Sequence, residues 1–177
     1  IQADIAQRLI KQGVSVWINN YRSINGIKKM INQLGLIVGK SKESQKIVNE
    51  IEKNIKIILK KNLKRGKKPK VYFEEWFDPL ISSIKWVSEI VEICGGTNYC
   101  ESKDAGSLAE DRIIKDPKEI VGFNPDIILV SWCGKKFKKE KMIKRDGWDS
   151  INEIKNNNVY EIDSSIILQP GPAALTD

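Results

Sequence analysis

Two adjacent acids and two bulky aromatic residues stand at the point where a predicted buried strand ends. In the stretch VYFEEWFDPL, Glu74, Glu75, Trp76 and Phe77 follow the apolar residues 71–73. Ligands of open parallel sheets bind outside the carboxyl ends of the strands. Flat apolar surfaces mixed with a few hydrogen-bonding groups suit a large amphipathic ligand, because apolar contact binds it and polar groups orient it.

The other predicted strands end in side chains of the same kinds. Strands are predicted at residues 14–18, 127–131 and 158–162, where short apolar runs stand between turn-forming residues. The strand ends and the segments after them give the candidate ligand-binding residues Asn20, Tyr21, Arg22, Glu74, Glu75, Trp76, Trp132, Cys133, Lys135 and Gln169.

A catalytic site is less well supported than a binding site. Glu74 and Glu75 are neighbours on a strand, so their side chains point to opposite faces and do not form an acid–base pair on one bond. The chain contains no histidine, and Cys133 therefore lacks an imidazole partner. No glycine-rich phosphate loop is present. A cytosolic α/β enzyme acting on a nucleotide or sugar remains the alternative of another class.

The three cysteines predict no metal site. Cys94, Cys100 and Cys133 form no CxxC pair, which disfavours zinc, and we expect no metal or cofactor. A short-loop disulfide between Cys94 and Cys100 is the alternative interpretation if the protein is exported. The favoured interpretation is that Cys94 is a small buried apolar residue of a helix.

The basic charge is weak evidence for a partner. The net charge is +7 over 177 residues, with a pI of about 9.2. Lysine far outnumbers arginine and accompanies many Ile and Asn residues, a pattern typical of AT-rich codons. The basic run at 63–70 has no interleaved aromatic residues and is better explained as a solvated helix end. We therefore expect no nucleic-acid partner, although a basic nucleic-acid module remains a third alternative. No apolar run reaches the ~18 residues that a membrane span needs.

The predicted elements describe an α/β protein. Helices are expected at 2–12 and from Ile24 to about Leu34, and a third helix of about six turns at ~3.6 residues per turn covers 41–63. Its single narrow apolar stripe favours a helix that lies across other elements. After residue 70, strands alternate with helices, including helices at 116–124 and 147–157, which predicts a doubly wound parallel sheet.

Three segments in the chain resemble a known family. They are KVYFEEWFDPLISSIKWVSEIVEICGG (70–96), NPDIILVSWCGKKF (124–137) and VYEIDSSIILQPGPAALTD (159–177). They look like the second lobe of the ABC-transporter substrate-binding proteins for vitamin B12 and iron–siderophores, closest to the cobalamin-binding members. VSVWINNYRSINGI (14–27) resembles the end of their first lobe.

This resemblance implies a fold of two Rossmann-like α/β lobes joined by one long backbone helix. Residues 1–39 would be the C-terminal part of the first lobe, 40–66 the connecting helix and 67–177 the second lobe. The chain begins with Ile rather than Met, and we expect a fragment that lacks the start of the first lobe and the C-terminal end. The resemblance also implies a monomer outside the cytoplasm, periplasmic or anchored to the membrane, with any signal segment outside this chain.

The resemblance further implies a ligand held between the lobes and delivery to an ABC permease. The expected ligand is a corrinoid, with a ferric siderophore or haem as the alternative. One of the carboxylates of Glu74 and Glu75 would face the ligand and the other would support the loop. Trp132 and Trp17 are candidate flat walls, although Trp17 lies inside a predicted strand, which favours a core role. Docking is expected at Asp177, while Asn25 stands where the first lobe would carry an acid.

Overall fold

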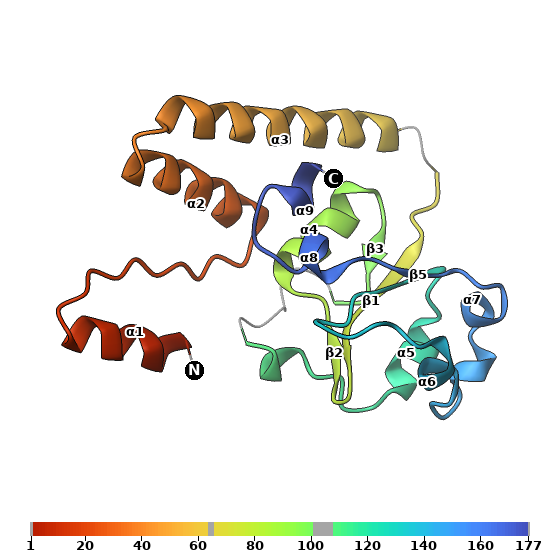
Figure 1. Cartoon of the computed structure of the whole chain (residues 1–177). Coiled ribbons are helices and arrows are strands. Elements are labelled where there is room, and N and C mark those ends of the chain that lie inside the picture. Colours follow the sequence, from red (N-terminus) through yellow and green to blue (C-terminus); the bar gives the residue numbers. More distant parts are fainter. Residues whose placement is uncertain (1, 64–65, 101–107, 177) are drawn as a thin grey trace.

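The computed structural model describes residues 2–63, 66–100 and 108–176. It contains an N-terminal helical part and a sheet covered by helices on both faces (Figure 1). The helical part consists of α1 (Gln2–Lys11), α2 (Ile24–Ile37) and α3 (Ser41–Asn62). Within these described ranges, no helix has both the length and the apolar character that crossing a bilayer requires.

The predicted strand at 14–18 does not form. Residues 14–22 adopt neither helix nor strand, and Trp17 and Ile18 are 43% and 63% exposed. A strand needs a neighbour for its backbone N–H and C=O groups, and none of the strands in the described ranges pairs with this segment. Trp17 is therefore not a core residue of this structure.

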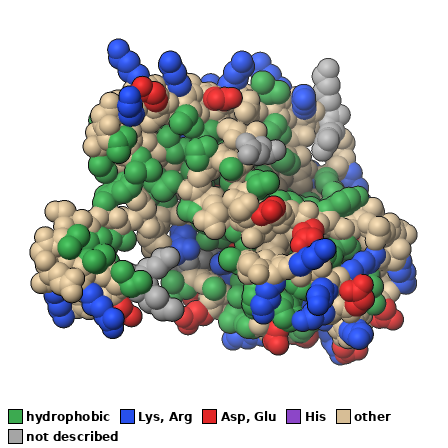
Figure 2. Space-filling view, in the orientation of Figure 1, with side chains coloured by type: hydrophobic (Ala, Val, Ile, Leu, Met, Phe, Trp, Pro, Cys, Tyr) green, Lys and Arg blue, Asp and Glu red, His purple; other side chains and the backbone are tan. Residues whose placement is uncertain are grey.

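Helices α2 and α3 form a hairpin at the edge of the molecule. Ser23 caps α2 by accepting a hydrogen bond from the Gly26 N–H at 3.1 Å, and Gly39 turns the chain with φ +68°. Ile27 and Ile51 are fully buried between the two helices and α4. As the narrow apolar stripe predicts, α3 runs across the outside of the molecule (Figure 1), and Lys and Arg side chains stand along its outer side (Figure 2).

The sheet is built around β1. Its five strands are β1 (Lys70–Phe77), β2 (Leu80–Ser82), β3 (Thr97–Asn98), β4 (Ile127–Val130) and β5 (Val159–Glu161). The order β2-β1-β4-β5 is parallel except for the β1–β2 hairpin, and β3 pairs in parallel with the start of β1. The expected parallel sheet is confirmed, with one antiparallel edge that the sequence pattern did not predict.

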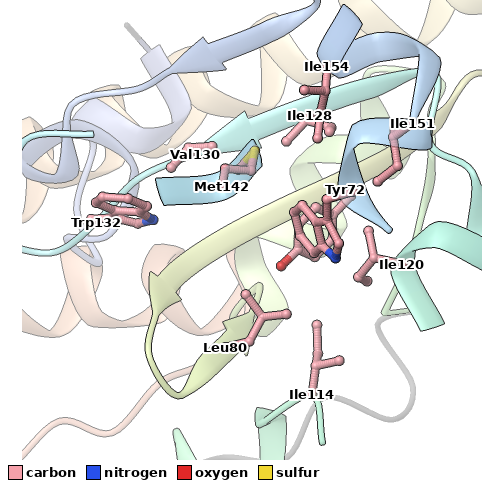
Figure 3. Packing of buried hydrophobic residues seen from close by; sticks show 11 residues of the cluster. Tyr72, Leu80, Ile114, Ile120, Ile128, Val130, Trp132, Met142, Ile151 and Ile154 are labelled. Carbon is pink, nitrogen blue, oxygen red and sulfur yellow. The ribbon is translucent and has the colours of Figure 1, made fainter. Parts of the chain in front are cut away.

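Alternate side chains of β1 enter two separate cores. Tyr72 belongs to one cluster and Phe73 to the other, and both are fully buried. The Phe73 cluster joins the sheet to α2, α3, α4 (Lys85–Ile93), α8 (Ser164–Ile167) and α9 (Ala173–Thr176). The Tyr72 cluster joins it to α5 (Lys118–Phe123), α6 (Lys139–Ile143), α7 (Asn152–Lys155) and the 3-10 turn Trp148–Ser150 (Figure 3).

Smaller expectations are corrected by the structure. The helix expected at 147–157 is broken into the 3-10 turn Trp148–Ser150 and α7, because Ile151 is extended between them. Cys94 is exposed at the end of α4 rather than buried, since the helix ends there and Gly95 turns away with φ +85°. The described ranges hold one sheet, so the arrangement of two lobes about α3 stays a prediction.

Candidate functional site

The carboxylate of Glu74 lies inside the molecule, beyond the middle of β1. Its side chain is fully buried, and Arg145 donates to both of its oxygens at 2.6 and 2.9 Å. The Trp132 indole N–H donates to Oε1 at 2.9 Å and the Tyr72 hydroxyl to Oε2 at 3.2 Å. This carboxylate is thus saturated by donors from three parts of the chain and holds the ends of β1 and β4 together.

Burial and the neighbouring carboxylate of Glu74 raise the pKa of the Tyr72 hydroxyl well above its usual range. The hydroxyl therefore keeps its proton and acts as a donor to Glu74. Tyr72, Trp132 and Arg145 are therefore all donors to the one carboxylate of Glu74.

Glu75 points to the opposite side of β1 and forms its own ion pair. Arg112 donates to its two oxygens at 2.5 and 3.0 Å, and the same guanidinium reaches the Ser82 carbonyl at 2.5 Å. Each of the two adjacent acids is thus held by a separate arginine. Through Arg112, Glu75 is connected to β2 of the β1–β2 hairpin, whereas Glu74 is directed into the core rather than to an open surface.

A β-bulge lies just before the two aromatic residues at the end of β1. The pairing of β1 with β2 shifts register between Glu74 and Trp76. A bulge re-aims the residues that follow it, and both Trp76 and Phe77 pack against the Tyr72 cluster. The Phe77 ring lies 4.7 Å from the ring of Trp132, centroid to centroid. Trp76, Phe77, Trp132 and Phe137 form one aromatic layer, defined by successive ring contacts.

The aromatic layer is covered by cations on its outer side. Lys135 Nζ lies 4.7 Å from the ring centroid of Trp76 and 5.4 Å from that of Phe77. Lys141 Nζ lies 4.3 Å from the Phe77 ring. Trp76 and Phe77 are half-buried, whereas Trp132 is 3% exposed and lies at the end of β4 beyond Val130 (Figure 3). Trp132 supports the layer from inside, and the rings of Trp76, Phe77 and Phe137 are the partly accessible ones.

A hollow of about 430 Å³ opens beside this layer, at the carboxyl ends of β4 and β5. It combines an aromatic edge, two amino groups, two carboxylates and a hydroxyl. Its lining consists of Trp132, Gly134, Lys135, Lys136, Glu161, Ile162, Asp163 and Ser164. This is the edge of the sheet at which ligands of parallel α/β folds bind.

The two acids of the hollow are engaged with backbone groups. Glu161 accepts from the Phe137 N–H and Asp163 from the Ser165 N–H, both at 2.8 Å. The hydrogen bond from Ser165 lowers the pKa of the Asp163 carboxyl below its usual range. Both acids therefore shape the loops around the hollow.

A second hollow, of about 530 Å³, lies between α3, α4, α8 and α9. Its lining is almost wholly isoleucine, alanine and leucine, with few groups that could orient a ligand. It also lies beside α3, on the Phe73 side of the sheet. The carboxyl-edge hollow is the better candidate because it unites apolar rings with polar groups.

The structure brings together only part of the predicted site. Glu74, Trp76, Trp132 and Lys135 meet at the carboxyl edge, and Cys133 is exposed next to Trp132. Within the described ranges, no hydrogen bond, ion pair or ring contact links the 20–22 segment to this edge. Asn20 accepts from Arg22 Nε at 2.9 Å, and the Tyr21 hydroxyl donates to Gln33 at 3.1 Å.

Gln169 is exposed between α8 and α9. The predicted docking residue Asp177 lies outside the described residues. In the part of the chain that the structure describes, no cluster of three or more Cys, Asp or Glu residues is arranged to hold a metal ion.

Sequence reasoning missed the arginines of this site. Arg145 follows no predicted strand and lies 71 residues from Glu74 along the chain, so only the tertiary structure pairs them. A signal was nevertheless available: a glutamate beside an apolar strand must be compensated if it is buried, and arginine is the side chain best suited to that.

The chain belongs to the periplasmic binding protein family, whose model matches residues 1–166. It is 26% identical over 173 residues to an uncharacterised ABC transporter substrate-binding lipoprotein, YvrC, of Bacillus subtilis (strain 168). That match covers 96% of this chain but 53% of the relative, so the chain spans about half of the relative's length. The family and this relative are transporter binding proteins rather than enzymes.

Solved structures show the same fold. An ABC transporter substrate-binding protein from Listeria monocytogenes EGD-e has a TM-score of 0.78 at 22% identity, covering 98% of this chain and 70% of that one. IsdE of S. aureus, solved in complex with heme, has a TM-score of 0.74 at 21% identity, covering 93% and 65%. At these identities the likeness defines the α/β fold alone.

Proposed function

We propose that the protein captures a corrinoid outside the cytoplasm and delivers it to an ABC importer. The carboxyl edge of β1, β4 and β5 would be its half of the ligand site, facing a first lobe to which residues 1–39 belong. The permease docks on the lobe tops, with Asp177 as the contact of the second lobe. Membership of the periplasmic binding protein family supports the class of this function.

One observation carries the proposal: Trp132 and Lys135 line a hollow with polar groups at its rim, and both contact the half-buried Phe77 ring of the aromatic layer. A corrin ring is large and flat, and its edge carries amide groups. Aromatic faces can contact such a ring, while hydroxyl and amino groups at the lip can orient its amides. The saturated Glu74 network keeps the aromatic layer in place before the ligand arrives.

A ferric siderophore or haem is the second candidate ligand. It is favoured by the amino groups of Lys135 and Lys136 at the hollow, which suit an anionic complex. The structural relative IsdE was solved with heme.

The test is a titration of the full-length protein with cyanocobalamin, followed by calorimetry and by corrin absorbance after gel filtration. We expect near-stoichiometric co-elution that persists at high salt. Trp76→Ala should weaken binding by about tenfold or more, since aromatic anchors dominate binding energies. Tyr160→Ala is the matched control, because Tyr160 is an exposed aromatic residue of β5 that belongs neither to the aromatic layer nor to the lining of the hollow. Failure to bind would reject the corrinoid, and the titration would be repeated with a ferric hydroxamate and with hemin.

A further inference from the structure

The amino group of Lys135 occupies the ring face that a flat ligand would need. Gly134, with φ +69°, turns the chain directly after β4 and Trp132. The turn places Lys135 Nζ over Trp76 and Phe77, at 4.7 and 5.4 Å from the ring centroids. Lys135 therefore covers an accessible side of the Trp76 and Phe77 rings in this structure.

Lys135 has no carboxylate partner at ion-pair distance among the residues that the structure describes. Both acids of the hollow, Glu161 and Asp163, accept hydrogen bonds from backbone N–H groups. The segment 134–145, which includes α6, contains six lysines and one arginine but only one acid, Glu140. Within the residues that the structure describes, Lys135 and Lys136 are therefore the charged side chains of the hollow that form no hydrogen bond or ion pair.

We infer that Lys135, with Lys136 beside it, forms a subsite for an oxyanion carried by the ligand. This inference rests on the proposed function, in which the ligand lies in this hollow. A cation over an exposed ring is held weakly, whereas a hydrogen bond between an ammonium and an oxyanion is charge-assisted and stronger. The oxyanion therefore draws Lys135 off Trp76, and the same movement uncovers the ring for the flat body of the ligand.

For a corrinoid, the matching group is the phosphodiester of the nucleotide loop. The corrin ring itself presents neutral amides, so the phosphodiester is the part that an ammonium recognises. Carboxylates of haem have the same anionic chemistry. Pairs of ligands that differ in a single anionic group distinguish the phosphodiester of a corrinoid from the carboxylates of haem.

The experiment compares cobalamin with cobinamide, which lacks the nucleotide loop, on full-length wild-type protein, Lys135→Gln and Lys138→Gln. Lys138 is the matched control because it is an exposed lysine of the same loop that does not line the hollow. Lys135→Gln should weaken cobalamin binding by about tenfold, since a charge-assisted hydrogen bond is lost. Its affinity for cobinamide should stay the same or rise, because the ring is uncovered. Equal losses for both ligands, or an equal effect of Lys138→Gln, would overturn the inference.

A second measurement does not depend on the identity of the ligand. Inorganic pyrophosphate should change the tryptophan fluorescence of the wild type as Lys135 leaves the Trp76 ring. Lys135→Gln and Trp76→Phe should both abolish this change, and Lys138→Gln should not. Absence of any change in the wild type overturns the oxyanion subsite. If neither corrinoid binds but the pyrophosphate response is present, the corrinoid proposal fails and the subsite stands. Hemin and its dimethyl ester then replace the corrinoid pair.

Discussion

Glu74 and Arg145 form a bidentate ion pair in which the carboxylate is fully buried and the arginine side chain is 13% exposed. Arg145 also donates to the Phe77 carbonyl at 3.2 Å and lies over the Trp148 ring. One guanidinium therefore connects the loop after α6 with the strand that carries the aromatic layer.

Removing only the cation should be strongly destabilising. Arg145→Met leaves Glu74 as an uncompensated buried charge, which costs about 3–5 kcal/mol of unfolding free energy. The double variant Glu74→Gln/Arg145→Met should recover part of this loss, because no buried charge remains. Urea unfolding monitored by circular dichroism measures the free energy of unfolding of both variants.

Lys144→Met is the control for Arg145→Met, since Lys144 is an exposed neighbour and its loss should change stability by less than about 0.5 kcal/mol. A loss below about 1 kcal/mol for Arg145→Met would contradict the dependence of the strand end on this pair.

The hairpin of α2 and α3 depends on a glycine. A Cβ added to Gly35 would lie 2.2 Å from Ser44 Oγ and 2.5 Å from Ser44 Cβ. Gly35→Ala should therefore destabilise the protein by about 1–3 kcal/mol through overpacking. Thermal unfolding should show a lower midpoint.

Two further variants separate packing from backbone effects. Gly122→Ala, in α5, meets no atom within 4 Å and should be neutral or stabilising by up to about 1 kcal/mol. Ser44→Gly should partly rescue Gly35→Ala, because it removes the atoms that clash. Strictly additive effects of the two substitutions would rule out the close contact as the cause.

The ion pair between α2 and α3 should titrate with acid. Lys28 Nζ lies 2.9 Å from Glu52 Oε1, and this hydrogen bond and charge lower the pKa of the Glu52 carboxyl below its usual value of about 4.5. A carboxyl whose pKa is lower in the folded state stabilises the fold above its unfolded pKa and loses that effect as the pH falls through the folded pKa. Lys28→Met should raise the pKa of Glu52 towards its ordinary value. Side-chain carbon NMR follows the titration directly, and an unchanged pKa would show that the pair does not persist in solution.

The start of α2 is tied to α4 by one side chain. Glu89 accepts a hydrogen bond from the Ile24 backbone N–H at 2.6 Å, which satisfies one of the N–H groups that a helix start leaves unpaired. Glu89→Ala should cost about 1 kcal/mol and speed amide exchange in the first turn of α2. Glu50→Ala, on the exposed side of α3, is the control. Equal exchange in both variants would mean that Glu89 does not hold α2.

Local pattern predicted most elements correctly. The strands β1, β4 and β5 and the long helix α3 follow from periodicity and turn residues, since these signals depend on near neighbours in the chain. The strand expected at 14–18 shows the limit, because strand formation needs a partner that a local pattern does not supply.

The sequence by itself determined the α/β class, the family resemblance and the placing of Glu74, Trp76, Trp132 and Lys135 near one edge of a sheet. Carboxyl ends of parallel strands meet at one edge, so chain position was enough for that. The tertiary structure decided which way each side chain turned. The bulge after Glu74 directs Trp76 and Phe77 to the same cluster, and Arg145 draws Glu74 into the core. Both depend on pairings between distant segments, whose geometry no local pattern contains.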